Sequence, residues 1–200
     1  VNLLDFAFLE SEFEVSSNSE KIIDLSLFSQ PEQKPGIYTG YLDVNSEYYV
    51  GSIFKEKIKN KISVVLTINE RHALFDIKLD LNNNSFRPGE IIKADFVLLN
   101  LGNLKDVDIL LRYGIKDMEG NVISEMEESL AVNSEKNLSR DLRVPFFAEK
   151  GDYVFYGEII YGERQAFASS TFNVFGEMRL FWKITFGIVT FLIICFVILL

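Results

Sequence analysis

Apolar and polar residues alternate along most of the second half of the chain, which is the pattern of half-buried strands. In the segment LFDIKLDL, Phe75, Ile77 and Leu79 fall on one side and the charged residues on the other. The alternation recurs with no helical period between residues 74 and 174. We therefore predict seven strands, at residues 74–81, 90–100, 107–117, 122–132, 138–144, 152–160 and 166–174.

Turn-forming segments separate these strands, among them NNNSFRPG, NLGN, DMEGN, NSEKN and AEKG. A two-sheet sandwich of immunoglobulin type buries one face of each such strand, and a small barrel is the alternative architecture. We predict that residues 71–178 form a complete seven-stranded immunoglobulin-like β-sandwich.

Residues 1–70 show the same alternation but hold fewer strands than a sandwich requires. The strands expected there are residues 21–28, 37–44 and 61–68, with weaker ones near 3–8 and 48–54. We expect this piece to be the C-terminal part of another sandwich whose first strands lie upstream of Val1. The short linker NERHA then restricts the angle between the two sandwiches.

A short phrase occurs in both halves of the chain, as KPGIYTG and as EKGDYVFYG. Gly36 and Gly151 are suited to the positive φ of a tight corner. Tyr38 and Tyr153 are then expected to point inward and to bond the backbone of the crossing loop, as in a tyrosine corner. Ligand-stacking aromatics are the alternative interpretation. The repeated phrase indicates a repeated domain.

The segments FRPGE, NLGN, VP and KGDY follow one another in an order that resembles CARDB-like immunoglobulin-like domains of archaeal and bacterial membrane-anchored surface proteins. The resemblance covers residues 74–175, and the first half of the chain shares only KPGIYTG. It implies a non-catalytic module for adhesion, spacing or carbohydrate contact at the cell surface.

The last seventeen residues, 184–200, carry no charge. As a helix they would span ~25 Å, close to the ~30 Å of a bilayer core. Phe181 and Trp182 are placed for the membrane interface, where Lys183 would reach the headgroups. We predict a single C-terminal transmembrane α-helix over residues 179–200, with a buried core helix or strand as the alternative.

Charge and residue inventory exclude several kinds of function. The net charge of −9 argues against nucleic-acid binding. The lone Cys195 excludes an internal disulfide and is expected to pack as an apolar residue. His72 has no suggested catalytic partner, and DMEGN offers too few oxygens for calcium. We therefore expect no enzyme activity, no metal and no cofactor.

Two features remain open to more than one interpretation. The basic run FKEKIKNK, residues 54–61, is either a solvated hairpin strand or a contact for anionic glycans or lipids. Asn83 and Asn137 begin glycosylation sequons and are both expected in loops.

Together these features predict an all-β chain of tandem immunoglobulin-like β-sandwiches, held in the cell membrane by one helix that places residues 184–200 in the lipid bilayer. We expect the sandwiches outside the cytoplasm, serving as an adhesive or structural spacer whose partner is another surface protein or a glycan. The alternatives are a β-sandwich subunit of a membrane protein assembly and a polysaccharide-binding accessory module.

Overall fold

A computed structural model describes residues 7–8, 13–16, 19–23, 26–27, 33–50, 54–70, 74–102 and 106–176. His72, the predicted interface residues Phe181, Trp182 and Lys183, and the apolar segment 184–200 lie outside the described residues. Within the described ranges, no helix is long and apolar enough to cross a membrane. Every regular element in these ranges is a strand.

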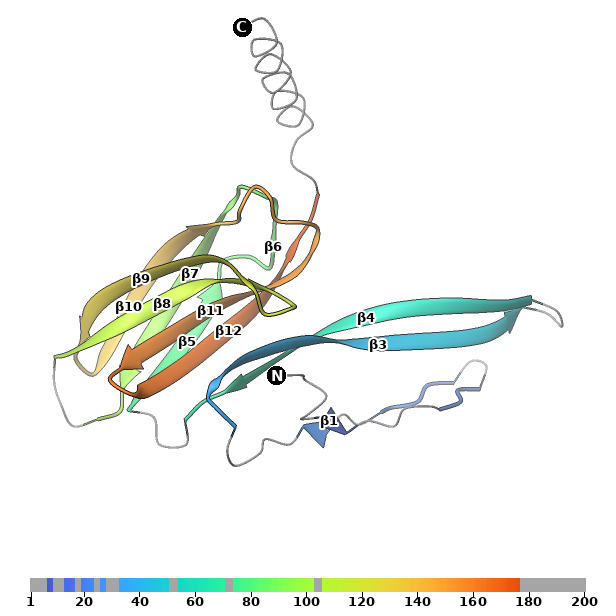
Figure 1. The fold of residues 1–200 in the computed structure, drawn as a ribbon, viewed down its shortest axis with the longest axis horizontal. Coiled ribbons are helices and arrows are strands. Elements are labelled where there is room, and N and C mark those ends of the chain that lie inside the picture. The colour runs from blue at the N-terminus through green and yellow to red at the C-terminus, as the bar shows by residue number, and fades with distance from the viewer. Residues whose placement is uncertain are drawn as a thin grey trace, which may run out of the picture.

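The second half of the chain forms two facing sheets (Figure 1). The three-stranded sheet has the order β10-β7-β5 and the five-stranded sheet has the order β6-β12-β11-β8-β9. This is the strand arrangement of an immunoglobulin-like sandwich, with one short parallel pair, β6 with β12, beside antiparallel neighbours. The strands are β5 (Phe75–Leu81), β6 (Ser85–Phe86), β7 (Ile91–Asn100), β8 (Val107–Asp117), β9 (Val122–Val132), β10 (Glu135–Arg143), β11 (Gly151–Tyr161) and β12 (Arg164–Val174).

All seven strands predicted for this half are present. They form two separate sheets, which excludes the barrel alternative. The prediction missed β6, because two residues are too few to show an alternation. It also began β10 three residues late, at 138 rather than Glu135. The sequence predicts a turn over the whole of NSEKN, yet Glu135 in this segment pairs with Leu99 of β7.

Alternate residues of the two sheets meet in one apolar core. At its centre the ring of Phe96 lies 5.8 Å from Tyr113 and 6.3 Å from Phe155, measured between centroids. Ile92, Leu98, Leu111, Ile115 and Ile159 are among the fully or almost fully buried residues around these rings. Both sheets contribute to this cluster, so neither face is stable without the other.

The glycine at 157 lets the two sheets approach closely. A Cβ there would lie 2.6 Å from Cε1 of Phe96 and 3.0 Å from Cδ1 of Ile77. Gly157→Ala is therefore expected to lower the free energy of unfolding by about 1–3 kcal/mol, through overpacking. Urea melts measure this loss, and adding Phe96→Leu should recover part of it by removing the opposing ring atoms. Unchanged stability of Gly157→Ala alone would contradict the tight packing described.

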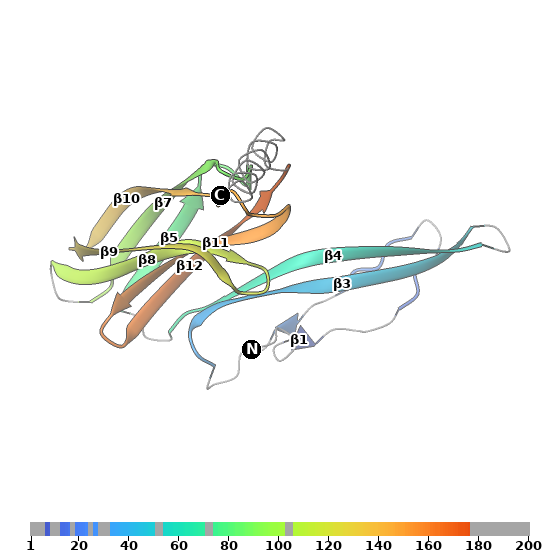
Figure 2. The same ribbon diagram turned by 45° about the horizontal axis from the view of Figure 1, so that its top comes forward.

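The first half of the chain contributes a long hairpin of β3 (Gly36–Val50) and β4 (Phe54–Ile68), and a short pair of β1 (Ala7–Phe8) and β2 (Ser26–Leu27). The hairpin reaches away from the sandwich, as a second view shows (Figure 2). Its strands are longer than the predicted 37–44 and 61–68. The basic run lies within β4, where Lys57 is 2.7 Å from Glu47 and Lys61 is 4.0 Å from Asp43.

The hairpin is amphipathic across its two faces. Even-numbered residues of both strands share one face, since Tyr38 pairs with Leu66 and Leu42 with Ile62. Towards the outer part of this face, Tyr48, Ile58 and Ile62 are 41%, 44% and 52% exposed. The opposite face carries the paired lysines in its outer part and a mixture of polar and apolar residues nearer its base.

Candidate functional site

Polar side chains at the base of the hairpin bond the outer face of the five-stranded sheet. We call this set the joint, and it consists of Ser63, Thr67, Asn69 and Glu70 together with Asp152, Arg164, Phe167 and Ser169. Ser63 Oγ donates to Asp152, and the hydroxyl oxygens of Thr67 and Ser169 lie 2.8 Å apart. The amide of Phe167 donates to Asn69 Oδ1 at 2.9 Å, and Arg164 Nη1 lies 3.4 Å from Glu70 Oε2.

Strand alternation explains why these side chains meet. Asp152 on β11 and Asn173 on β12 are register partners on the face that points away from the core. Ser63 and Thr67 lie on the odd-numbered face of the hairpin, four residues apart along β4. The joint therefore brings together the odd-numbered face of the hairpin and the outer face of the sandwich, where Val154 is fully buried as well.

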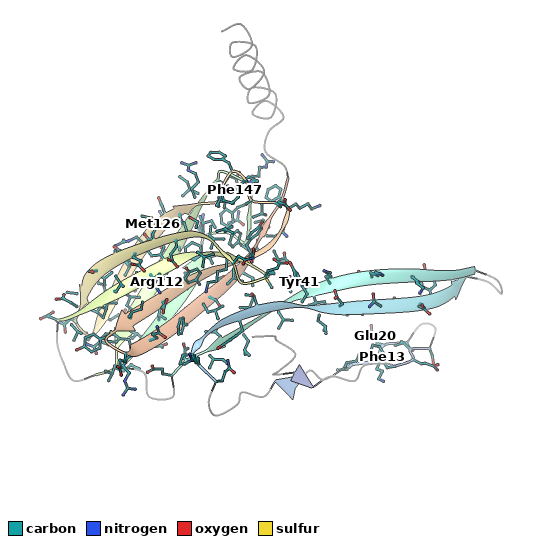
Figure 3. All side chains as sticks on the ribbon, in the orientation of Figure 1. Phe13, Glu20, Tyr41, Arg112, Met126 and Phe147 are labelled. Atoms are coloured by element: carbon teal, nitrogen blue, oxygen red, sulfur yellow. The ribbon has the colours of Figure 1, made fainter. Side chains whose placement is uncertain are left out.

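Asp152 is the best-connected residue of the joint. Its second oxygen accepts a hydrogen bond of 2.8 Å from Asn173 Nδ2. The hydrogen bonds from Ser63 and then Asn173 lower the pKa of this carboxyl, against a smaller opposing effect of burial. Nearby, burial raises the pKa of the Tyr41 phenol, and Glu119 and Asp152 add to that effect. Tyr41 lies where the hairpin approaches the sandwich (Figure 3).

A charged network crosses the same outer face further along, on β8, β9 and β11. Arg112 stands between Glu158 and Glu127 in one row of register partners. Its Nη1 is 3.0 Å from Glu158 Oε2, and its Nε is 2.5 Å from Glu127 Oε1. Glu158 is only 6% exposed, so Arg112 supplies charge compensation that water does not. Figure 3 labels Arg112 on this face of the sandwich.

The next row of the network depends on a glycine, which has no side chain to fill the space. Tyr156 and Glu125 flank Gly114 in the register, and the Tyr156 hydroxyl bonds the Glu125 carboxylate across it. A Cβ at 114 would lie 2.9 Å from the Tyr156 ring and 2.4 Å from the Ser124 carbonyl oxygen. Lys116 Nζ sits 4.5 Å from the centroid of the same ring. Gly114 thus makes room for the tyrosine to reach β9.

Burial dominates the electrostatics of this network. It raises the pKa of Glu158, which Arg112 opposes, and it raises the pKa of Tyr156. It lowers the pKa of Lys116, which Glu158 and Glu125 oppose. Perturbed groups often mark active sites, but structural ion-pair networks perturb pKa values too. Since Glu158 is enclosed by its own partner Arg112, the network is suited to holding three strands in register.

The predicted corner residues occupy equivalent places in the two units. The Tyr153 hydroxyl donates to the carbonyl of Glu149 at 3.0 Å, and the Tyr38 hydroxyl donates to that of Lys34 at 2.7 Å. Each bond therefore spans four residues. Gly36 and Gly151 also share a backbone setting, with φ of 157° and 159°. Each corner bonds the chain just before its own hairpin.

Burial excludes the ligand-stacking alternative for Tyr153. Tyr153 is 8% exposed, and its ring stacks on Phe172 with centroids 5.8 Å apart. Burial also raises the pKa of its phenol. A ring covered in this way has no face left for a ligand.

The two sequon asparagines are both exposed. Asn83 lies in the turn between β5 and β6, as predicted. Asn137 was expected in a loop, and this was wrong, because it lies within β10 and pairs with Val97. The Asn137 side chain is nevertheless at the surface, because the odd-numbered residues of β10 point away from the core.

No arrangement of metal ligands appears within the described part of the chain, where no group of three or more His, Cys, Asp or Glu side chains could hold an ion. The segment DMEGN forms the turn between β8 and β9. There Asp117 Oδ1 accepts a hydrogen bond of 2.8 Å from the Asn121 amide.

Comparison with known proteins gives matches of structure alone. No family model matches the chain, and no curated protein matches it either. A CARDB domain from Pyrococcus furiosus in complex with di-metal ions is similar at 13% identity and a TM-score of 0.37, over 55% of this chain and 95% of that one. The sporulation control protein Spo0M of Bacillus subtilis is similar at 13% identity and a TM-score of 0.39, over 53% and 51%.

An alkylpurine DNA glycosylase of Pseudomonas fluorescens is similar at 18% identity and a TM-score of 0.41, over 52% of this chain and 31% of that one. The chain thus spans about half of the length of Spo0M and about a third of that of the glycosylase. All three likenesses have TM-scores below 0.5 and identities below 20%, and no statement about this chain rests on them.

Proposed function

We propose that the protein is a membrane-anchored spacer outside the cytoplasm, in which tandem immunoglobulin-like units hold a binding surface at a set distance from the bilayer. The observation that carries this proposal is the joint. Four polar links attach the hairpin to the outer face of the sandwich. A spacer needs such links, because a free linker would let the two units swing.

The tandem arrangement rests on the likeness between two hairpins. The strands β3 and β4 begin with the same Gly-x-Tyr corner as β11 and β12. In both hairpins the tyrosine shares a face with apolar residues, Phe155 and Ile159 in one and Leu42 and Val44 in the other. On this proposal the even-numbered face of β3 and β4 belongs to the core of a second sandwich, in which further strands cover the side chains of Tyr48, Ile58 and Ile62.

The anchor rests on the sequence of residues 184–200, which has no charge and nearly the length of a bilayer core. A single span of this kind fixes one end of a chain and leaves the rest free to project.

Distances between the two units test the joint. In full-length protein with Cys195→Ala, spin labels at Asn45→Cys on β3 and Asp141→Cys on β10 should give one narrow distance distribution. Adding Asp152→Ala and Thr67→Val should broaden it, because two of the four links are lost. The matched control is Asp95→Ala, which removes a similar pair, with Ser139 Oγ 2.6 Å from Asp95, far from the joint. A broad distribution before the joint is altered would contradict the spacer.

A second candidate is a subunit of a membrane assembly. It is favoured by the exposed apolar residues Tyr48, Ile58 and Ile62 on the hairpin. In that case another protein, and not strands of the same chain, covers this face. The two candidates differ in the purified protein, where an uncovered face would bind apolar dyes strongly and a covered face would not.

A further inference from the structure

Three phenylalanines are exposed at one end of the sandwich. Phe146 and Phe147, in the segment between β10 and β11, are 52% and 73% exposed, and Phe175, just after β12, is 38% exposed. Phe147 appears at the end of the sandwich where β12 finishes (Figure 3). Large apolar side chains gathered at one tip of a domain mark a surface that contacts something other than water.

The turn between β6 and β7 holds these rings together. The Phe175 amide donates to the Phe86 carbonyl at 3.0 Å, and the Arg87 guanidinium lies 5.3 Å from the centroid of Phe175. On the other side of the turn, Gly89 leaves room for Phe146, since a Cβ there would be 2.3 Å from its ring. The β6–β7 turn therefore positions Phe146 and Phe175.

Cationic groups accompany the rings. Arg143 lies 6.0 Å from the centroid of Phe146, and its Nη1 donates to the Gly89 carbonyl at 2.6 Å. Residues 86–90 and 143–150 contain three basic residues, Arg87, Arg143 and Lys150, and two acidic ones, Glu90 and Glu149, which gives +1. At the same end the turn after β8 adds Asp117 and Glu119, so the positive balance is confined to these two segments.

The connection after β12 is short, so the end of the sandwich that carries Phe175 stays close to the apolar segment 184–200. Only residues 177–183 separate Gly176 from Ile184, and seven residues span at most ~25 Å even when fully extended. If residues 184–200 lie in a bilayer, the end of the sandwich that carries Phe175 is within that distance of its surface. The opposite end is farther away by the length of β7, ~30 Å.

We propose that this end of the sandwich rests on the lipid bilayer, with Phe146 and Phe147 among the headgroups and Arg87 and Arg143 on lipid phosphates. Aromatic rings with neighbouring cations are the side chains that favour the membrane interface. The contact would orient the sandwich, and hence the hairpin, relative to the membrane. This inference rests on the membrane anchor of the proposed function.

Tryptophan fluorescence in vesicles tests the contact. The chain has a single tryptophan, Trp182. Full-length protein with Trp182→Phe and Phe147→Trp is reconstituted into phosphatidylcholine vesicles, with and without lipids brominated near the headgroup. We expect the probe to be strongly quenched and its emission shifted to the blue. The matched control is Leu101→Trp in the same background, since Leu101 is 62% exposed at the opposite end. It should be unaffected.

The wild-type protein separates failure of this inference from failure of the anchor. If Trp182 is quenched and the Phe147→Trp probe is not, the bilayer contact is wrong and the anchor stands. If neither is quenched, the anchor is wrong and the contact falls with it. Equal quenching of the Phe147→Trp and Leu101→Trp probes would also overturn the proposal, because the sandwich would then have no preferred end at the membrane.

Discussion

Replacing Arg112 by leucine is expected to lower the free energy of unfolding by about 3–5 kcal/mol at neutral pH. The reason is the carboxylate of Glu158, which is 6% exposed and lies 3.0 Å from the Arg112 guanidinium. Without that guanidinium, the buried carboxylate of Glu158 keeps only weaker compensation from Lys116 on β8, which favours the charged form of Glu158. Urea melts of the two proteins measure the loss.

The loss should shrink as the pH falls. Burial raises the pKa of Glu158 above its ordinary value, and Arg112 is the first effect that opposes this. Losing Arg112 raises the folded-state pKa further, so the folded variant holds its proton more tightly than the unfolded chain. Such a group stabilises the fold below the unfolded pKa, near ~4.3, and this stabilisation is lost as pH rises through the folded pKa.

The variant that removes both charges is the control. Arg112→Leu with Glu158→Leu should recover most of the lost stability at neutral pH, because two apolar groups replace a buried ion pair at little cost. Equal loss for Arg112→Leu at every pH, or a double variant no better than the single one, would contradict the buried pair.

Replacing Tyr153 by alanine is expected to lower the free energy of unfolding by about 3–5 kcal/mol, through the cavity left beside Phe172. The Tyr153 ring is 8% exposed and stacked on Phe172. Tyr153→Phe keeps the ring and removes only the hydrogen bond to Glu149, so it should cost about 1 kcal/mol.

The pair of variants separates the ring from its hydroxyl. Melts of wild type, Tyr153→Phe and Tyr153→Ala should fall in that order of stability. Equal stability of wild type and Tyr153→Ala would show that the tyrosine corner does not stabilise the fold. A loss for Tyr153→Phe as large as that for Tyr153→Ala would assign the whole effect to the hydroxyl.

The strands of the sandwich could be predicted because an alternation of period two records which face is buried. Phe75, Ile77 and Leu79 show this directly. The same rule has a length limit, which is why β6, with only Ser85 and Phe86, was missed. The loop expected around Asn137 was wrong for a related reason, since polar residues on an outer strand look like a turn.

The joint and the charged network could not be predicted in this way. Arg112 meets Glu158 and Glu127 only through strand register, across sequence separations of 46 and 15 residues. Ser63 meets Asp152 across 89 residues. Alternation shows that such side chains point outward but not which strands become neighbours. The Gly-x-Tyr phrase was visible because its hydrogen bond spans only four residues.

The most direct test of a membrane-anchored spacer outside the cytoplasm is the accessibility of the sandwich in intact cells. Asp141, on the exposed side of β10, is replaced by cysteine in a Cys195→Ala background, and cells are treated with a membrane-impermeant maleimide. We predict that the cysteine at position 141 is labelled in intact cells, while the native Cys195 of the wild-type protein is not. Labelling at position 141 only after lysis would place the sandwich inside the cell and contradict the account.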